Sequence, residues 1–229
     1  MGRFDFYGEK YRVIKTLFMI SNLITRSFAF LFFFTAITPV VIGHAHPFSS
    51  EIQNPILLGT TFIFVATIIG VLLVGGVWKW SDIGFRPEPF FKGFWWYPLV
   101  WGAALLVAGP YARFLGFTKP IDLSQVSTFK LVLWSGIFCH MQDILYWGFL
   151  ANIATRMFAK SKVVPPLLVI TLFIGMHSLF PRPLQVMAFV APGAVIFTLL
   201  YREYKNMYLI TLTHSILSLI AFSLGVFHY

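Results

Sequence analysis

The chain has 229 residues, of which 58% are hydrophobic, 19% aromatic and only 11% charged, and its formal net charge is +9. Soluble domains carry about 25% charged residues, and a compact soluble fold of this size could not bury so much apolar surface, since the mean hydropathy is +0.80. These values exclude a disordered chain and an ordinary soluble enzyme, and the single cysteine, Cys139, excludes an intrachain disulfide and a cysteine-rich metal site.

The chain begins with a basic stretch and continues with apolar runs. Residues 1–26 predict a cytoplasmic or interfacial segment, and residues 27–229 a single transmembrane domain. Apolar runs of about 17–25 residues are long enough to cross a bilayer as helices. Seven such runs follow in chain order: Ser27–Gly43, Ile56–Trp78, Phe94–Ala112, Leu131–Ile153, Val164–Leu179, Leu184–Tyr201 and Met207–Phe227. We therefore expect an all-α fold, a polytopic membrane helix bundle of about seven transmembrane helices.

The basic residues between the runs predict the orientation. If the N-terminus is cytoplasmic, 13 of the 17 Lys and Arg residues fall in cytoplasmic segments, as the positive-inside rule requires. The expected topology is N-in and C-out, in an integral, multi-pass protein of a bacterial or archaeal cytoplasmic membrane. Membrane lipid is then an expected partner. Nucleic acid is not, because the basic residues are scattered over loops on both sides of the membrane.

Few ionisable residues fall within the predicted runs. Such residues cost about 2.5–3.5 kcal/mol each on insertion scales and indicate function by default. The only acid there is Asp143, and the histidines are His140, His177 and His214, on three different runs. Gln142 adjoins Asp143, and Ser218 lies one helical turn after His214. We expect Gln142, Asp143, His177, His214 and Ser218 to line one cavity.

Three short strings carry a family resemblance. Residues 142–150, QDILYWGFL, resemble the first motif of the CPBP family of CAAX proteases and bacteriocin-processing proteins, EExxxRGFL. Residues 173–177, FIGMH, are similar to its second motif, FxxxH, and residues 214–218, HSILS, to its third, HxxxN. Residues 82–86, DIGFR, are like a segment that frequently precedes the motifs. The resemblance covers a core of about residues 80–227.

The resemblance implies a glutamic-type intramembrane endopeptidase that needs no cofactor. The first Glu and the second-motif His would activate a water, and the third-motif residues would stabilise the oxyanion of the attacked peptide. By position, Gln142 stands for that Glu, Asp143 for the second Glu, Trp147 for the Arg and His177 for the water-binding His. His214 and Ser218 stand for the oxyanion pair. A transmembrane or prenylated peptide would be the substrate.

The departures from the motifs leave several interpretations open. A neutral amide at position 142 cannot accept a proton, so peptide hydrolysis is expected to be impaired. The chain could be a natural pseudoprotease that binds a protein, lipid or pigment partner in a membrane complex, a divergent enzyme in which Asp143 is the base, or an inactivated variant. A metal or haem site built from His140, His177, His214 and Asp143 ranks last, because His140 lies about 200° around the helix from Gln142.

Overall fold

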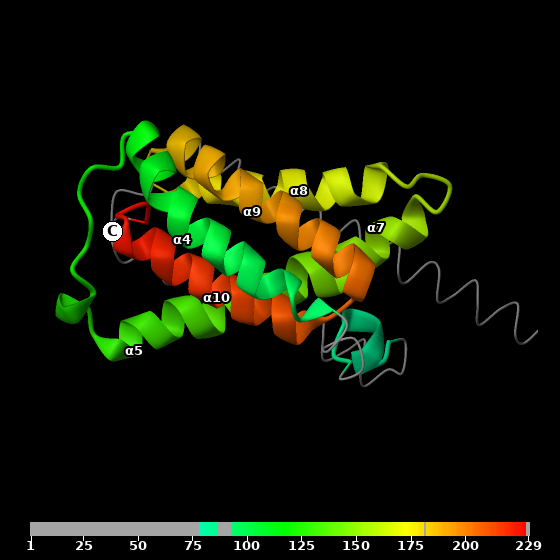
Figure 1. Ribbon diagram of the computed structural model, residues 1–229. Coiled ribbons are helices and arrows are strands. Elements are labelled where there is room, and N and C mark those ends of the chain that lie inside the picture. Colours follow the sequence, from blue (N-terminus) through cyan, green and yellow to red (C-terminus); the bar gives the residue numbers. More distant parts are fainter. Residues whose placement is uncertain (1–77, 87–92, 181, 228–229) are drawn as a thin grey trace, which may run out of the picture.

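The computed structural model describes residues 78–86, 93–180 and 182–227. The N-terminal segment 1–26 and the predicted runs Ser27–Gly43 and Ile56–Trp78, except for Trp78 itself, lie outside the described residues. Within the described part, the chain forms helices and connecting loops with no strand, which confirms the all-α fold class (Figure 1).

The described elements follow one another with short connections. In chain order they are η1 (Trp80–Ile83), α4 (Trp96–Phe114), η2 (Leu123–Gln125), α5 (Thr128–Leu131), η3 (Val132–Phe138), α6 (Cys139–Asp143), η4 (Ile144–Leu150), α7 (Ala151–Met157), α8 (Val164–Met176), η5 (His177–Leu179), α9 (Pro183–Tyr204) and α10 (Met207–Ser223). Elements η3 and η4 are π-helical, so α5 to α7 form one helical run in which the five-residue α6 lies between two π-helical stretches.

The predicted runs from position 94 onward each coincide with a helix or a helical run. By length and composition, one described helix, α9, is able to cross a membrane, while α8 and α10 are shorter apolar helices. Prolines stand where α8 and α9 begin, at positions whose N–H groups would have no partner within the helix. Asn206 caps α10, because its side-chain oxygen accepts a hydrogen bond from the Leu209 N–H at 3.1 Å.

Helix α10 is the centre of the bundle and packs against α4, α6 and α9. Polar side chains connect these neighbours. The Trp101 indole of α4 donates to the Thr213 hydroxyl of α10 at 3.0 Å, and the Tyr111 hydroxyl of α4 donates to the Ala188 carbonyl of α9 at 3.0 Å. Such interhelical bonds hold helices in register where the surroundings offer few other polar partners.

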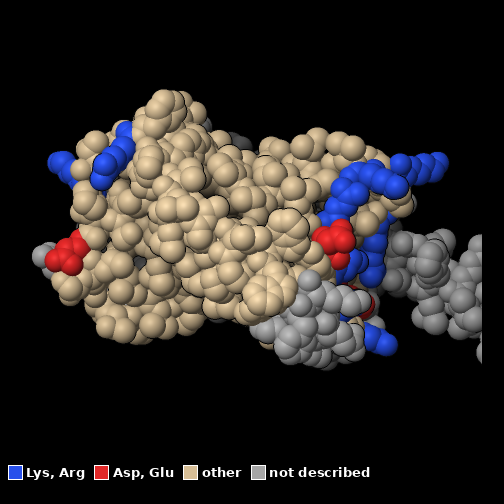
Figure 2. All heavy atoms as spheres, in the orientation of Figure 1, with Lys and Arg blue, Asp and Glu red and all other residues tan. Residues whose placement is uncertain are grey.

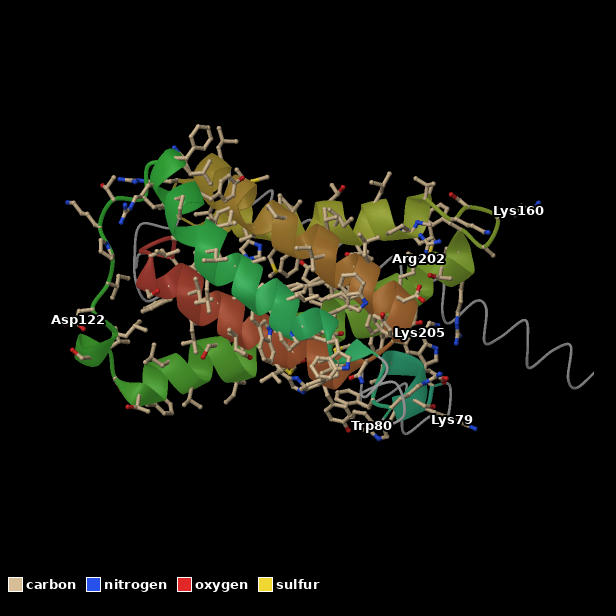
Figure 3. The ribbon with its side chains drawn as sticks, viewed as in Figure 1. Lys79, Trp80, Asp122, Lys160, Arg202 and Lys205 are labelled. Atoms are coloured by element: carbon tan, nitrogen blue, oxygen red, sulfur yellow. The ribbon has the colours of Figure 1, made fainter. Side chains whose placement is uncertain are left out.

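Charged side chains lie at the two ends of the elongated molecule, and the middle of the face in Figure 2 is free of them. Lys79, Lys160, Arg202 and Lys205 lie at one end and Asp122 at the other (Figure 3). Between the ends, large apolar side chains point outward, including Leu105 at 69% and Leu106 at 79% exposure in the middle of α4. An exposed apolar band between two charged ends is typical of a protein surrounded by lipid.

Candidate functional site: a polar cluster in an apolar cavity

A cavity of about 470 Å³ lies among α4, α6, α9 and α10. Its wall is mainly apolar, with Leu99 and Val107 from α4 and Phe197 from α9 among the lining side chains. Four of the five predicted site residues line it: Gln142, His177, His214 and Ser218. Its volume falls within the range of about 300–1,000 Å³ that is usual for small-molecule sites. The structure thus brings three separate motifs of the sequence to one space.

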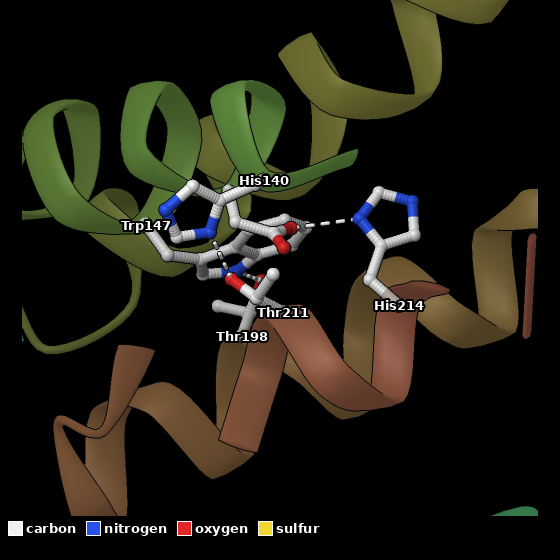
Figure 4. Close-up of polar contacts among 6 residues, drawn as sticks. His140, Trp147, Thr198, Thr211 and His214 are labelled. Atoms are coloured by element: carbon white, nitrogen blue, oxygen red, sulfur yellow. Dashed lines mark hydrogen bonds and ion pairs between the residues drawn. The ribbon is translucent and has the colours of Figure 1, made fainter. Parts of the chain in front are cut away.

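Asp143, the fifth predicted residue, does not line the cavity but lies behind His214. Its side chain is fully buried, and its Oδ1 accepts a hydrogen bond from Nδ1 of His214 at 2.7 Å (Figure 4). The other carboxylate oxygen, Oδ2, has no hydrogen-bond partner among the described residues. Since Nδ1 of His214 faces the carboxylate, Nε2 is the nitrogen that is left to accept a proton. Asp143 can therefore act on a molecule in the cavity through His214.

His177 is held by its own helix. Helix α8 ends at Met176, and Nδ1 of His177 lies 2.8 Å from the Phe173 carbonyl oxygen. A carbonyl only accepts, so Nδ1 carries the proton and the lone pair of the neutral ring is on Nε2. His177 is 3% exposed. The Phe173 ring contacts both imidazoles, with centroid distances of 4.8 Å to His177 and 5.7 Å to His214, so the two histidines lie close to one shared ring.

Two further residues singled out in the sequence have structural contacts outside the cavity. Nδ1 of His140 lies 3.0 Å from the Thr211 hydroxyl of α10, and the Trp147 indole donates to the Thr198 hydroxyl of α9 at 3.1 Å (Figure 4). Trp147 is fully buried. The side chain in the position of the family's Arg therefore connects η4 to α9. His140 is not among the residues that line the cavity, as its helical angle from Gln142 predicts.

The proposed set of metal ligands does not come together. Within residues 78–86, 93–180 and 182–227, no three His, Cys, Asp or Glu side chains are placed to hold a metal ion. Nδ1 of His214 is paired with Asp143, and Nδ1 of His177 faces the Phe173 carbonyl. His140 contacts Thr211 outside the cavity, so the four side chains do not point at one common position.

One cavity residue was not recognised from the sequence. Cys139 lines the same wall as Gln142 and His214, and it is 5% exposed. Its position one helical turn before Asp143 is a signal that the sequence contained, because residues four apart share a helix face. The count of one cysteine bears only on disulfides and cysteine-rich metal sites, and it carries no information on this position in the fold.

No family model matches the sequence, and comparison with curated proteins and with solved structures finds no significant similarity. The resemblance to the CPBP motifs therefore rests on the residues themselves and on their placement in one cavity.

Proposed function

We propose that the chain is a multi-pass membrane protein built on the plan of a CPBP-type intramembrane endopeptidase, with peptide hydrolysis impaired by Gln142. The outward apolar band and the charged ends support the membrane location. The sequence supplies two further apolar runs before residue 78, which complete the seven spans of this proposal.

The observation that carries the proposal is the convergence of Gln142, His177, His214 and Ser218 on one cavity. Hydrolysis by an activated water needs a base near the water and donors near the developing oxyanion. His177 offers Nε2 to a water, while Ser218 is a hydroxyl donor. Gln142 has the shape of a glutamate but no basicity, and losing a positioned general base typically costs on the order of 10²–10⁴-fold in rate.

A second candidate function is supported by the same cavity. Among the described residues, no carboxylate lines the wall, and most of the wall is apolar. A catalytically silent family member could hold an apolar partner there, such as a lipid, a pigment or a transmembrane segment. This candidate predicts binding without turnover.

The substitution Gln142→Glu separates the two candidates. The purified full chain in lipid nanodiscs is incubated with a quenched fluorescent peptide that contains a transmembrane segment. We expect Gln142→Glu to raise the cleavage rate by roughly 10²–10⁴-fold, and Gln142→Met, a neutral side chain of similar length, to leave it unchanged.

No cleavage by the folded Gln142→Glu chain would overturn the endopeptidase proposal and leave the binding function. If Asp143→Asn abolishes a measurable activity of the chain as it stands, Asp143 rather than residue 142 supplies the basicity through His214.

A further inference from the structure

We propose that Cys139, His214 and Asp143 form a nucleophile–base–orienting-acid set that cleaves thioesters of long apolar acyl chains in the cavity. This activity goes beyond the proposed peptide hydrolysis, because it uses a covalent nucleophile where the protease uses an activated water. It depends on the same cavity but not on any basicity at position 142.

The three side chains come from two helices that pack against each other, α6 and α10. The Asp143 carboxylate accepts from Nδ1 of His214 at 2.7 Å, and Cys139 lines the cavity together with His214. Cys139 and Asp143 are one turn apart on α6, so a single helix face presents both to α10. A thiol beside a histidine that is oriented by a carboxylate is the arrangement that activates a cysteine nucleophile.

The surroundings of the thiol supply the other parts of an acyl-transfer site. Gln142 and Ser218 line the same cavity as Cys139 and carry N–H and O–H donors. Neither side chain has a hydrogen-bond partner among the described residues. Donors of this kind stabilise the oxyanion that forms when a carbonyl is attacked. A neutral amide at position 142 suits this role, whereas a carboxylate would repel the oxyanion.

A second, independent observation points to a ligand. His177 is 3% exposed and lines the cavity, yet its Nε2 makes no hydrogen bond with the described residues. A lone pair that faces a largely apolar cavity is satisfied when a ligand or a water donates to it. The polar side chains that line the cavity include Cys139, His177 and His214, and most of the other lining residues are apolar.

The small number of polar side chains in a mainly apolar cavity indicates the class of substrate. An extended peptide brings backbone N–H and C=O groups along its whole length, and each needs a partner when it is buried. An acyl chain brings one carbonyl at its end and only apolar methylenes beyond it. The apolar walls contributed by α4 and α9 match the chain, and the cluster of Cys139, His214, Gln142 and Ser218 matches the carbonyl.

The reaction has two steps with water as the second reactant. In the first, Nε2 of His214 takes the thiol proton, Sγ of Cys139 bonds to the acyl carbon, and the carbon–sulfur bond of the substrate breaks; His214 then protonates the departing thiolate. In the second, water loses a proton to His214 and adds to the acyl carbon, the bond to Sγ breaks, and Cys139 regains a proton. The products are a free carboxylic acid and a free thiol.

The single cysteine makes the test direct. The purified full chain in detergent micelles is mixed with a palmitoyl thioester of a small thiol, and the intact mass of the protein and the free palmitic acid are followed with time. We expect an acyl adduct that hydroxylamine removes, no adduct in Cys139→Ala, and adduct formation slowed by roughly 10²–10⁴-fold in His214→Gln. The acetyl thioester should react much more slowly, because its short acyl group makes little contact with the apolar walls of the cavity.

His140→Gln is the matched control, because His140 lies on the same helix but contacts Thr211 outside the cavity; its rate should equal that of the unchanged chain. Thermal unfolding of each variant identifies those that fail to fold. Asp143→Asn is a second, conservative variant, and it should also slow the formation of the acyl adduct. The proposal would be overturned if folded His214→Gln and folded Asp143→Asn formed the adduct as fast as the unchanged chain. Release of palmitic acid by Cys139→Ala would overturn it as well. Peptide cleavage by Gln142→Glu should survive Cys139→Ala, so either proposal can fail without the other.

Discussion

The contact between Asp143 and His214 is expected to hold α6 on α10, and its contribution to stability can be measured. Both side chains are buried, and Asp143 has no hydrogen-bond partner other than His214 among the described residues. Removing one member of a buried pair leaves the other without compensation, which typically costs about 3–5 kcal/mol. We expect Asp143→Ala to lower the free energy of unfolding by that amount, equivalent to roughly a 10²–10⁴-fold change in the unfolding equilibrium.

A double-mutant cycle isolates the pair from the loss of packing. The free energies of unfolding of Asp143→Ala, His214→Ala and the double variant are measured by titrating mixed micelles with denaturing detergent and following circular dichroism. Since groups in one buried network couple, we expect the double variant to lose about 1–3 kcal/mol less than the two single losses together.

The contact between His140 and Thr211 provides the control, because it joins the same two helices at a partly buried position. Its expected coupling is about 0.6 kcal/mol, the average for hydrogen bonds between membrane helices. Additive losses for Asp143 and His214, within about 0.3–0.5 kcal/mol, would show that the 2.7 Å contact does not stabilise the fold and would refute the reasoning.

Three more predictions address packing, capping and topology. A Cβ at Gly148 would lie 3.1 Å from the Met207 side chain, so Gly148→Val should lower the free energy of unfolding by about 1–3 kcal/mol in the same titration; an unchanged midpoint would contradict this packing. Asn206→Ala removes the cap of α10 and should cost about 0.5–2 kcal/mol, whereas Asn206→Ser should retain most of it. In intact vesicles, cysteines introduced at Lys160 and Asp122 should react with an impermeant maleimide from opposite sides, and labelling of both from one side would refute the proposed topology.

The positions of the helices from residue 94 onward could be predicted because long apolar runs broken by Pro and charged residues leave few alternatives. The run Leu131–Ile153 predicts one helix, and the structure has one continuous helical run there. Its π-helical stretches could not be predicted, because they arise where side-chain packing shifts the backbone bonding by one residue. The local sequence of Val132–Phe138 contains no signal for that shift.

The candidate site could be predicted in part. Helical spacing and motif order indicated that Gln142, His177, His214 and Ser218 belong together, and all four line the cavity. The position of Asp143 behind His214 depends on how α6 is turned against α10, which a sequence does not show. The place of Cys139 in the cavity follows from its spacing of one turn from Asp143, and the number of cysteines gives no indication of it.

The two π-helical stretches make the site depend on the length of the chain as well as on the identity of its residues. Asp143, directly before η4, is hydrogen-bonded to His214 of α10, and Trp147, within η4, to Thr198 of α9. Deleting one residue between these two anchors would turn one against the other by roughly a quarter of a helical turn, so both contacts could not form together. An aligned relative with one residue fewer at 144–146 could therefore keep every polar residue of the cluster and still lack the cavity's chemistry.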